Sequence, residues 1–132
     1  MSKKLKWLDR TLIVSSHCIT LCTTEKGFSK ALKHLRIPKK DRPTFVCNWH
    51  SDATAHYFEN HEHHTKAVVV CLRNFEDKSV EQQVGLLAHE AVHIWQQVKA
   101  DYGEATPSPE FEAYSIQSLV QLLFAEFRRQ TA

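Results

Sequence analysis

The sequence predicts an α+β fold in one domain, residues 1–132. Short runs of β-branched and aromatic residues come first, and two long stretches with helical periodicity follow them. A chain of 132 residues has the size of one domain, and no repeat, low-complexity tract or linker divides it. We therefore expect a small antiparallel or mixed sheet packed on two long C-terminal helices.

The first third of the chain predicts a strand, a short helix and a loop. Residues 11–22 are strand-like or mixed in pattern. Residues 28–35 are expected to be helical, because four apolar side chains share one face: Phe28, Ala31, Leu32 and Leu35. Residues 37–43 contain two prolines and are expected to form a turn or loop.

Three runs in the middle of the chain predict strands: residues 44–49, 53–58 and 66–73. Residues 59–65 separate the last two runs and predict a hairpin tip. Histidines gather in this part of the sequence: His56, His61, His63 and His64. We expect them to be solvated, and a role in substrate binding or adventitious metal binding is the alternative.

The rest of the chain predicts two long helices, residues 80–100 and 109–129. Ser79 and Gln82 form a capping-box signature before the first helix. Along this helix five apolar residues recur as a core stripe: Val84, Leu87, Ala91, Ile94 and Val98. The second helix starts with Ser108 as a suitable N-cap and Pro109 at its first position, and it is apolar round much of its circumference.

The first long helix contains an H-E-x-x-H motif at residues 89–93. Residues four apart lie nearly above one another on a helix, so His89 and His93 can each turn a ring nitrogen to one tetrahedral zinc ion. Glu90 lies about 100° round the helix and can reach a water on that ion. Because zinc lowers the pKa of a bound water to about 7, a carboxylate that takes its proton leaves a hydroxide nucleophile. The motif predicts two metal ligands and a base.

An accidental match is the alternative, because 9 of the 132 residues are His. A buried, hydrogen-bonded histidine pair on a packed helix would give the same pattern. Both histidines fall on a stripe that adjoins the core stripe and also holds Leu86 and Gln97. Ligands at the floor of a cleft would border the core in this way, so the context favours a metal site.

A catalytic zinc needs a third protein ligand and an open fourth position. Glu110 and Glu112 lie at the start of the last helix, within the sequence Glu-Phe-Glu-Ala-Tyr at residues 110–114. A favourable interaction with the positive helix N-terminus is the other role that either carboxylate could have. Both are therefore candidates for the third ligand.

The motif at 89–93 followed by the residues at 110–114 resembles the gluzincin metallopeptidases, many of which carry Glu-x-x-Ala-Asp or Glu-x-x-Ala-Asn on a later helix. The chain also looks like small phage- or prophage-associated metallopeptidases. The resemblance implies a zincin-like fold with Glu110 as the third zinc ligand, whereas a thermolysin-like arrangement would make Glu112 the ligand. Tyr114 departs from the pattern, because a phenol cannot orient a ligand histidine as a carboxylate does.

The resemblance implies a zinc metallopeptidase in which His89, His93 and Glu110 hold Zn²⁺. Glu90 would activate the bound water, and an edge strand near residues 67–73, over the metal, would pair with a peptide or protein substrate. Three residues are candidates to stabilise the oxyanion: Tyr57, His56 and Tyr114. The alternatives are a non-catalytic, zinc-stabilised protein-binding module such as a phage accessory factor, and a hydrolase of non-peptide amides. The intact Glu90 favours catalysis, since a structural site needs no base.

Charge and composition limit the partners and the cellular compartment that we expect for the chain. The net charge of +2 predicts neither a nucleic-acid nor a membrane partner. No apolar stretch is long enough for a signal peptide or a membrane span, so we expect a cytoplasmic protein with reduced thiols. Four residues have spacings seen in structural zinc sites: Cys18, Cys22, Cys47 and His50. We favour small buried apolar residues as the role of these cysteines.

Overall fold

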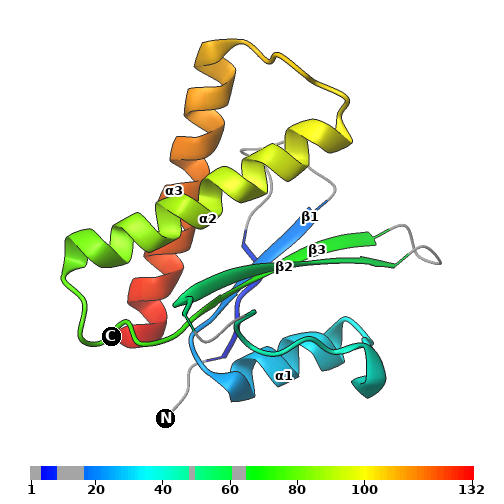
Figure 1. Cartoon of the computed structure of the whole chain (residues 1–132), viewed down its shortest axis with the longest axis vertical. Coiled ribbons are helices and arrows are strands. Elements are labelled where there is room, and N and C mark those ends of the chain that lie inside the picture. The colour runs from blue at the N-terminus through cyan, green and yellow to red at the C-terminus, as the bar shows by residue number, and fades with distance from the viewer. Residues whose placement is uncertain (1–3, 9–16, 48–49, 61–64) are drawn as a thin grey trace.

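The computed structural model describes residues 4–8, 17–47, 50–60 and 65–132 of the chain. The fold is α+β as expected, with a three-stranded sheet between helix α1 on one face and helices α2 and α3 on the other (Figure 1). In chain order the elements are β1 (His17–Cys22), α1 (Glu25–His34), a 3₁₀ turn (Lys39–Asp41), β2 (Ala53–Asn60), β3 (Thr65–Leu72), α2 (Val80–Asp101) and α3 (Pro109–Thr131).

The sheet is mixed, and its strand order is β1-β3-β2. β3 lies in the centre, parallel to β1 and antiparallel to β2. Residues 67–72 of β3 are apolar and buried without interruption, because helices cover both faces of this strand. The prediction of an edge strand near residues 67–73 was therefore wrong, because β1 and β2 pair with the two sides of β3. β2 is left at one edge of the described sheet.

Alternate residues of the sheet point into two separate cores. Val68 and Val70 belong to the larger core, with Leu87 and Ile94 of α2 and Leu119 and Leu123 of α3. Val69 belongs to the smaller core, together with Cys71 and three residues of α1: Phe28, Ala31 and Leu32. Burial of each large side chain stabilises the fold by about 1.5–3 kcal/mol. The larger core holds α2 against the sheet and so fixes the position of the H-E-x-x-H motif.

Local signals define both ends of α2. The Ser79 side chain accepts the Gln82 N–H, and the Gln82 side chain accepts the Ser79 N–H, which confirms the capping box. The helix ends at Asp101, and Gly103 follows with a φ of 72°, in the left-handed region that glycine adopts at little cost.

α3 begins after Ser108, whose side chain accepts the N–H of Phe111, and it crosses α2 (Figure 1). Trp95 of α2 is 1% exposed and packs edge-on against Phe111, with ring centroids 5.4 Å apart. This contact joins the two helices near the start of α3.

No helix in the described part of the chain is both long enough and apolar enough to cross a bilayer.

The prediction of a strand at residues 44–49 was wrong for residues 44–47: residue 44 has no regular structure, and residues 45–47 form bends. Residues 48–49 lie outside the described residues. The Thr44 hydroxyl donates to the Val46 carbonyl, a local bond that competes with strand pairing. The Cys47 N–H donates to the Thr54 side chain instead of a neighbouring backbone. Phe45 packs against the smaller core, so the apolar pattern that suggested a strand reflects burial alone.

The other element boundaries agree closely with the sequence. α1 begins at residue 25 rather than 28, because the Thr24 side chain caps it by accepting the Gly27 N–H. The strand expected within residues 11–22 is confirmed for residues 17–22, and residues 9–16 lie outside the described residues. Most of the expected hairpin tip, with His61, His63 and His64, also lies outside them. The remaining strands and both long helices differ from expectation by two residues or fewer at each end.

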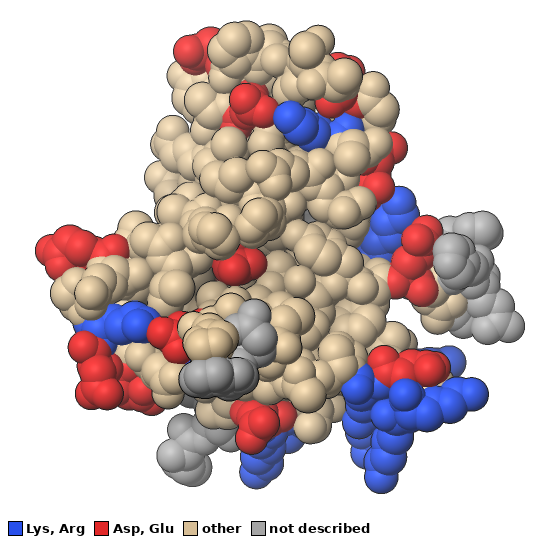
Figure 2. Space-filling view, viewed as in Figure 1, with Lys and Arg blue, Asp and Glu red and all other residues tan. Residues whose placement is uncertain are grey.

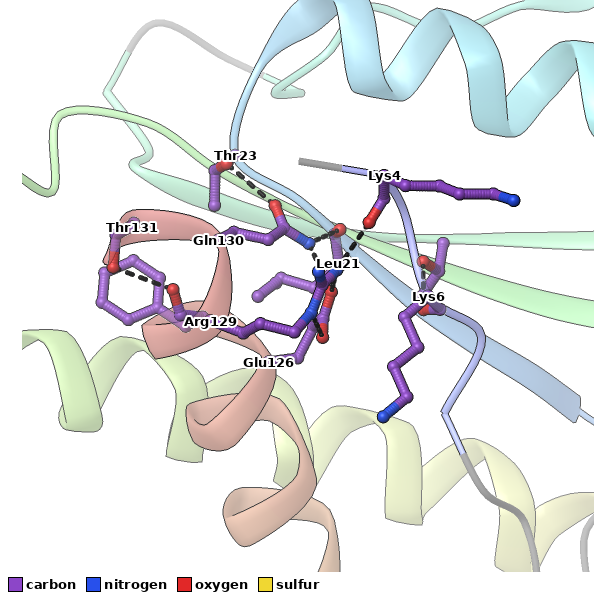
Figure 3. Close-up of polar contacts among 10 residues, drawn as sticks. Lys4, Lys6, Leu21, Thr23, Glu126, Arg129, Gln130 and Thr131 are labelled. Atoms are coloured by element: carbon purple, nitrogen blue, oxygen red, sulfur yellow. Dashed lines mark hydrogen bonds and ion pairs between the residues drawn. The ribbon is translucent and has the colours of Figure 1, made fainter. Parts of the chain in front are cut away.

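A buried carboxylate ties the end of α3 to the sheet and to residues 4–8 (Figure 3). Glu126 is 3% exposed and accepts hydrogen bonds from Arg129 at 2.8 and 2.7 Å and from Gln130 at 2.8 Å. Gln130 also donates to the Leu21 carbonyl, and Arg129 donates to the Lys4 carbonyl. Burial alone would raise the pKa of Glu126, but the hydrogen bonds from Arg129 and Gln130 outweigh it and hold the pKa below 4.5.

We expect Glu126→Gln to lower the free energy of unfolding by about 2 kcal/mol at neutral pH, the net contribution of a hydrogen bond to a charged group. A lowered pKa in the folded state stabilises the protein above the unfolded pKa, and the effect is lost as pH falls through the folded value. The difference between wild type and variant should therefore shrink below pH 4.5. Urea denaturation at neutral and acidic pH measures it. Glu104→Gln, an exposed change, is the control, and an undiminished difference in acid would contradict the charged role of Glu126.

Candidate metal centre and hydrolytic site

The two motif histidines converge beside α2. His89 and His93 lie one turn apart on its exposed side, and their Nε2 atoms are 3.1 Å apart. The rings are nearly perpendicular, with centroids 4.7 Å apart and an interplanar angle of 77°. Two nitrogens bound to one tetrahedral zinc ion at 2.0–2.1 Å would be about 3.3 Å apart. The pair thus has nearly the separation that a shared metal requires.

Gln96 favours one tautomer of the His93 ring. Its side-chain oxygen lies 3.1 Å from Nδ1 of His93. An amide oxygen only accepts, so Nδ1 carries the proton and the lone pair of His93 is on Nε2. When no metal is bound, this lone pair accepts the Nε2–H of His89. Gln96 therefore presents His93 in the tautomer that a metal needs.

Glu90 lies between α2 and β2 and is 6% exposed. Its carboxylate accepts a hydrogen bond from the backbone N–H of Ala55 in β2. Burial raises the pKa of Glu90 above 4.5, against the opposing effects of the two histidines and of Ala55. A carboxylate with a raised pKa is a stronger proton acceptor, which suits a general base.

The register of β2 explains why Ala55 is available to Glu90. The Arg73 N–H donates to the Asp52 carbonyl, so these two residues form a hydrogen-bonded pair at the end of the β2–β3 ladder. Hydrogen-bonded pairs alternate along antiparallel strands, so residues 54 and 56 bond to β3, whereas residues 53, 55 and 57 direct their backbone groups to the outer edge. Glu90 takes one of these outer N–H groups.

Two cavities meet at Glu90 along the groove between α2 and β2. One has a volume of about 420 Å³, and its lining includes His93 and Gln96 of α2 and Tyr57 of β2. The other has a volume of about 470 Å³, and its lining includes His50 and His89. Both are lined by Ala53 and Glu90. The groove therefore continues on both sides of the carboxylate.

The structure separates the three candidates for stabilising an oxyanion. Tyr57 lines the cavity that also holds Glu90 and His93. Burial and the nearby charge of Glu90 raise the pKa of Tyr57 to about 12, so its hydroxyl keeps its proton at neutral pH. His56 was expected to be solvated, but it is 7% exposed and points to the other face of the sheet, where its Nε2 bonds to the Phe45 carbonyl at 2.9 Å. Tyr114 is 63% exposed on α3 and lines neither cavity. Tyr57 is the candidate that the groove contains.

The structure does not bring the predicted third ligand to the histidine pair. Glu110 is exposed on the first turn of α3. Glu112 accepts the indole N–H of Trp95 at 2.8 Å, and its carboxylate lies 3.7 Å from the Lys99 ammonium. Trp95 is about 200° round the helix from His93, so Glu112 faces another side of α2. Among the residues that the structure describes, no three His, Cys, Asp or Glu side chains are grouped to hold a metal ion. The Nε2–Nε2 distance of the histidine pair is compatible with a shared zinc ion, and both the metal and its third ligand stay predictions.

The second zinc site considered from the sequence is not formed within the described residues. Cys18 and Cys22 are four residues apart on β1, which separates them by about 13 Å, too far for one ion with Zn–S bonds of about 2.3 Å. Cys22 and Cys71 are buried neighbours on β1 and β3. Burial, with the hydrogen bond to Cys22, raises the pKa of Cys71. Buried thiols of this kind are unreactive and act as small apolar residues.

Sequence reasoning missed two contributors to the site, Gln96 and Ala55. Gln96 follows His93 by three residues, a spacing that places both on one side of a helix, so the sequence held a signal for it. Ala55 contributes only its backbone N–H, for which no side-chain pattern exists.

Comparison of the chain with protein-family models, with curated proteins and with solved structures found no match in any of the three.

Proposed function

We propose that the chain is a zinc-dependent hydrolase of peptide bonds, with His89 and His93 as metal ligands and Glu90 as the general base. The observation that carries the proposal is the convergence of two Nε2 atoms, 3.1 Å apart, beside a buried carboxylate with a raised pKa. A bound Zn²⁺ would supply a water of lowered pKa and polarise the scissile carbonyl.

The protein groups around this point have complementary tasks. Glu90 takes a proton from the attacking water and later delivers it to the leaving amine, while the Ala55 N–H keeps the carboxylate in place. Tyr57 remains protonated at neutral pH and can donate to the oxyanion that develops on the substrate. Gln96 holds the Nδ1–H of His93 and leaves its Nε2 lone pair for the ion.

The groove favours an extended chain as the substrate. A peptide that lies along β2 could pair with the outer backbone groups at residues 53 and 57, on either side of the residue that bonds Glu90. Pairing of this kind binds main chain with little regard for side chains. The two cavities beside Glu90 give room for residues on both sides of a scissile bond.

Glu110 is proposed as the third ligand on the resemblance to gluzincins alone. It would have to approach the histidines when zinc binds, through a movement of the first turn of α3. The connecting residues 102–106 are exposed, so few of their contacts would oppose this movement. The Trp95–Glu112 hydrogen bond and the Trp95–Phe111 contact oppose such a movement.

The same opposition favours a second candidate function, a non-catalytic protein-binding module stabilised by zinc. Neither Glu110 nor Glu112 forms a ligand set with the histidines in the described residues. A partner protein could then supply the missing ligand and seat itself on the groove. Against this alternative, a binding module has no use for a buried carboxylate with a raised pKa next to the metal.

Purified protein incubated with a mixed peptide library should cut peptides in the presence of zinc, with the products identified by mass spectrometry. Chelation of zinc should stop cleavage, and added zinc should restore it. Cleavage that persists under chelation would contradict the proposal. Stoichiometric zinc without cleavage of any peptide would favour the binding module.

A further inference from the structure

The net charge of +2 conceals an uneven distribution of charge along the chain. Residues 1–42 hold 11 of the Lys and Arg residues and only 3 Asp and Glu, whereas residues 43–132 hold 6 and 12. In Figure 2 the largest group of Lys and Arg side chains lies at the lower right, on the side of the molecule where Figure 1 shows α1. This side is across the sheet from the histidine pair, so its charge belongs to a different surface.

Residues 4–8 are fixed beside this basic side by hydrogen bonds to distant segments. The Leu8 N–H donates to the Ile19 carbonyl, and the Thr20 hydroxyl donates to the Lys6 carbonyl. The segment lies against α1 at Gly27, where a Cβ would be 3.6 Å from the Leu5 side chain, an ordinary van der Waals contact. These contacts hold residues 4–8 in a fixed position beside α1.

A cavity of about 570 Å³ lies between the segment and α1. Its lining combines three lysines with two aromatic rings: Lys4, Lys26 and Lys30 with Trp7 and His34, next to Leu5, Gly27 and Ala31. The Trp7 and His34 rings contact each other, with centroids 5.4 Å apart and a tilt of 35° between their planes, and we call this ring pair the Trp7–His34 platform. Flat rings with positive charges around them suit a ligand that has both an aromatic base and phosphate.

The lysines of this cavity are exposed, and none of them has an ion pair with a residue in the described part of the chain. Lys26, Lys30 and Lys33 recur at helical spacing along α1 and span about 10 Å. Glu25 is the one acidic residue of this helix. The row of cations is thus longer than a single phosphate needs and is suited to a phosphate backbone.

We propose that this aromatic and basic cavity, formed by residues 4–8 and α1, binds single-stranded nucleic acid. Bases stack on the Trp7–His34 platform, and phosphates contact Lys4, Lys26 and Lys30. A duplex keeps its bases stacked inside and offers no free ring to such a cavity. A membrane surface is flat, whereas this platform lies in a concavity.

Fluorescence anisotropy with labelled twelve-nucleotide oligo(dT) or oligo(U) tests the proposal. We expect Lys26→Glu/Lys30→Glu to weaken binding and to lower the slope of log affinity against log salt by about 1.4, since each phosphate contact on a single strand accounts for about 0.7. Lys39→Glu/Lys40→Glu, which reverses the same amount of charge outside the cavity, is the matched control and should weaken binding much less. Both pairs are exposed, so the fold should persist.

Trp7→Leu should weaken oligonucleotide binding roughly 5- to 150-fold without changing the salt slope, because it removes stacking and no charge. Trp7→Phe, which keeps an aromatic ring, should recover part of the affinity. Equal losses from the two lysine pairs would overturn the proposal in favour of a diffuse electrostatic field. Absence of oligonucleotide binding, equally tight binding of a duplex of the same length, or Trp7-independent binding to phosphatidylglycerol vesicles would overturn it as well.

Discussion

Glu90→Gln is expected to lower peptide hydrolysis roughly 10²- to 10⁴-fold, the effect of a lost general base, while zinc binding stays at the wild-type level. Glutamine has nearly the same size as glutamate, and its side-chain oxygen can still accept the Ala55 N–H. The groove between α2 and β2 should therefore keep its shape. Only the ability to take a proton is removed. Rates on a cleaved library peptide and zinc content, measured on the same preparation, separate the two properties.

Glu81→Gln is the matched control, because it makes the same chemical change on the exposed first turn of the same helix. Its hydrolysis rate should equal that of the wild type. An active Glu90→Gln protein would contradict the role of Glu90 as the base and leave its burial as a structural feature. Loss of zinc from Glu90→Gln would instead make the carboxylate part of the metal site.

The elements that the sequence predicted well are those with local signals. The Ser79–Gln82 capping box and the Ser108 N-cap fix the starts of α2 and α3 through side chains within three residues of the helix ends. The unbroken apolar run of β3 predicted a buried strand, but its central place in the sheet depends on pairing with β1 and β2 and was not predicted. The convergence of His89 and His93 follows from helical geometry alone, so it too could be predicted.

Features that depend on packing between distant segments could not be predicted from the sequence. Phe45 and Val46 look like part of a strand, yet their positions depend on α1 and on the Thr54 side chain. The same limitation applies to Glu112, because only the crossing of α3 over α2 shows that it meets Trp95. Tyr57 and His56 are neighbours in sequence, but the pleat of β2 sends them to opposite faces of the sheet.

The edge position of β2 links the fold to the proposed chemistry. An exposed strand edge attracts other strands, and proteins usually cover or charge it. Here the carboxylate of Glu90 bonds to one outer N–H of β2, which places a negative charge at the middle of this edge. The same contact holds the proposed base where a substrate strand would arrive. The hydrogen bond between Glu90 and the Ala55 N–H therefore protects the edge of β2 and positions the proposed base.

His89→Ala and His93→Ala are each expected to lower the affinity for zinc by more than roughly 100-fold, because even changes in groups that only orient a ligand cost 10- to 100-fold. The variants should fold, since both histidines are exposed and outside the two cores. Competition with a coloured zinc chelator measures the affinity, and circular dichroism checks the helix content. Unchanged zinc affinity in both variants would contradict the proposed metal centre.

Glu110→Gln and Glu112→Gln extend the zinc measurement to the third ligand. If Glu110 completes the site, Glu110→Gln should lose zinc and Glu112→Gln should keep it, because glutamine at 112 can still accept the Trp95 N–H. Loss of zinc from Glu112→Gln would transfer the ligand role to that residue and require it to leave Trp95. Wild-type affinity in both variants would contradict the assignment of Glu110. Catalysis would then need a ligand from outside the first turn of α3, and the open coordination positions would favour the binding module.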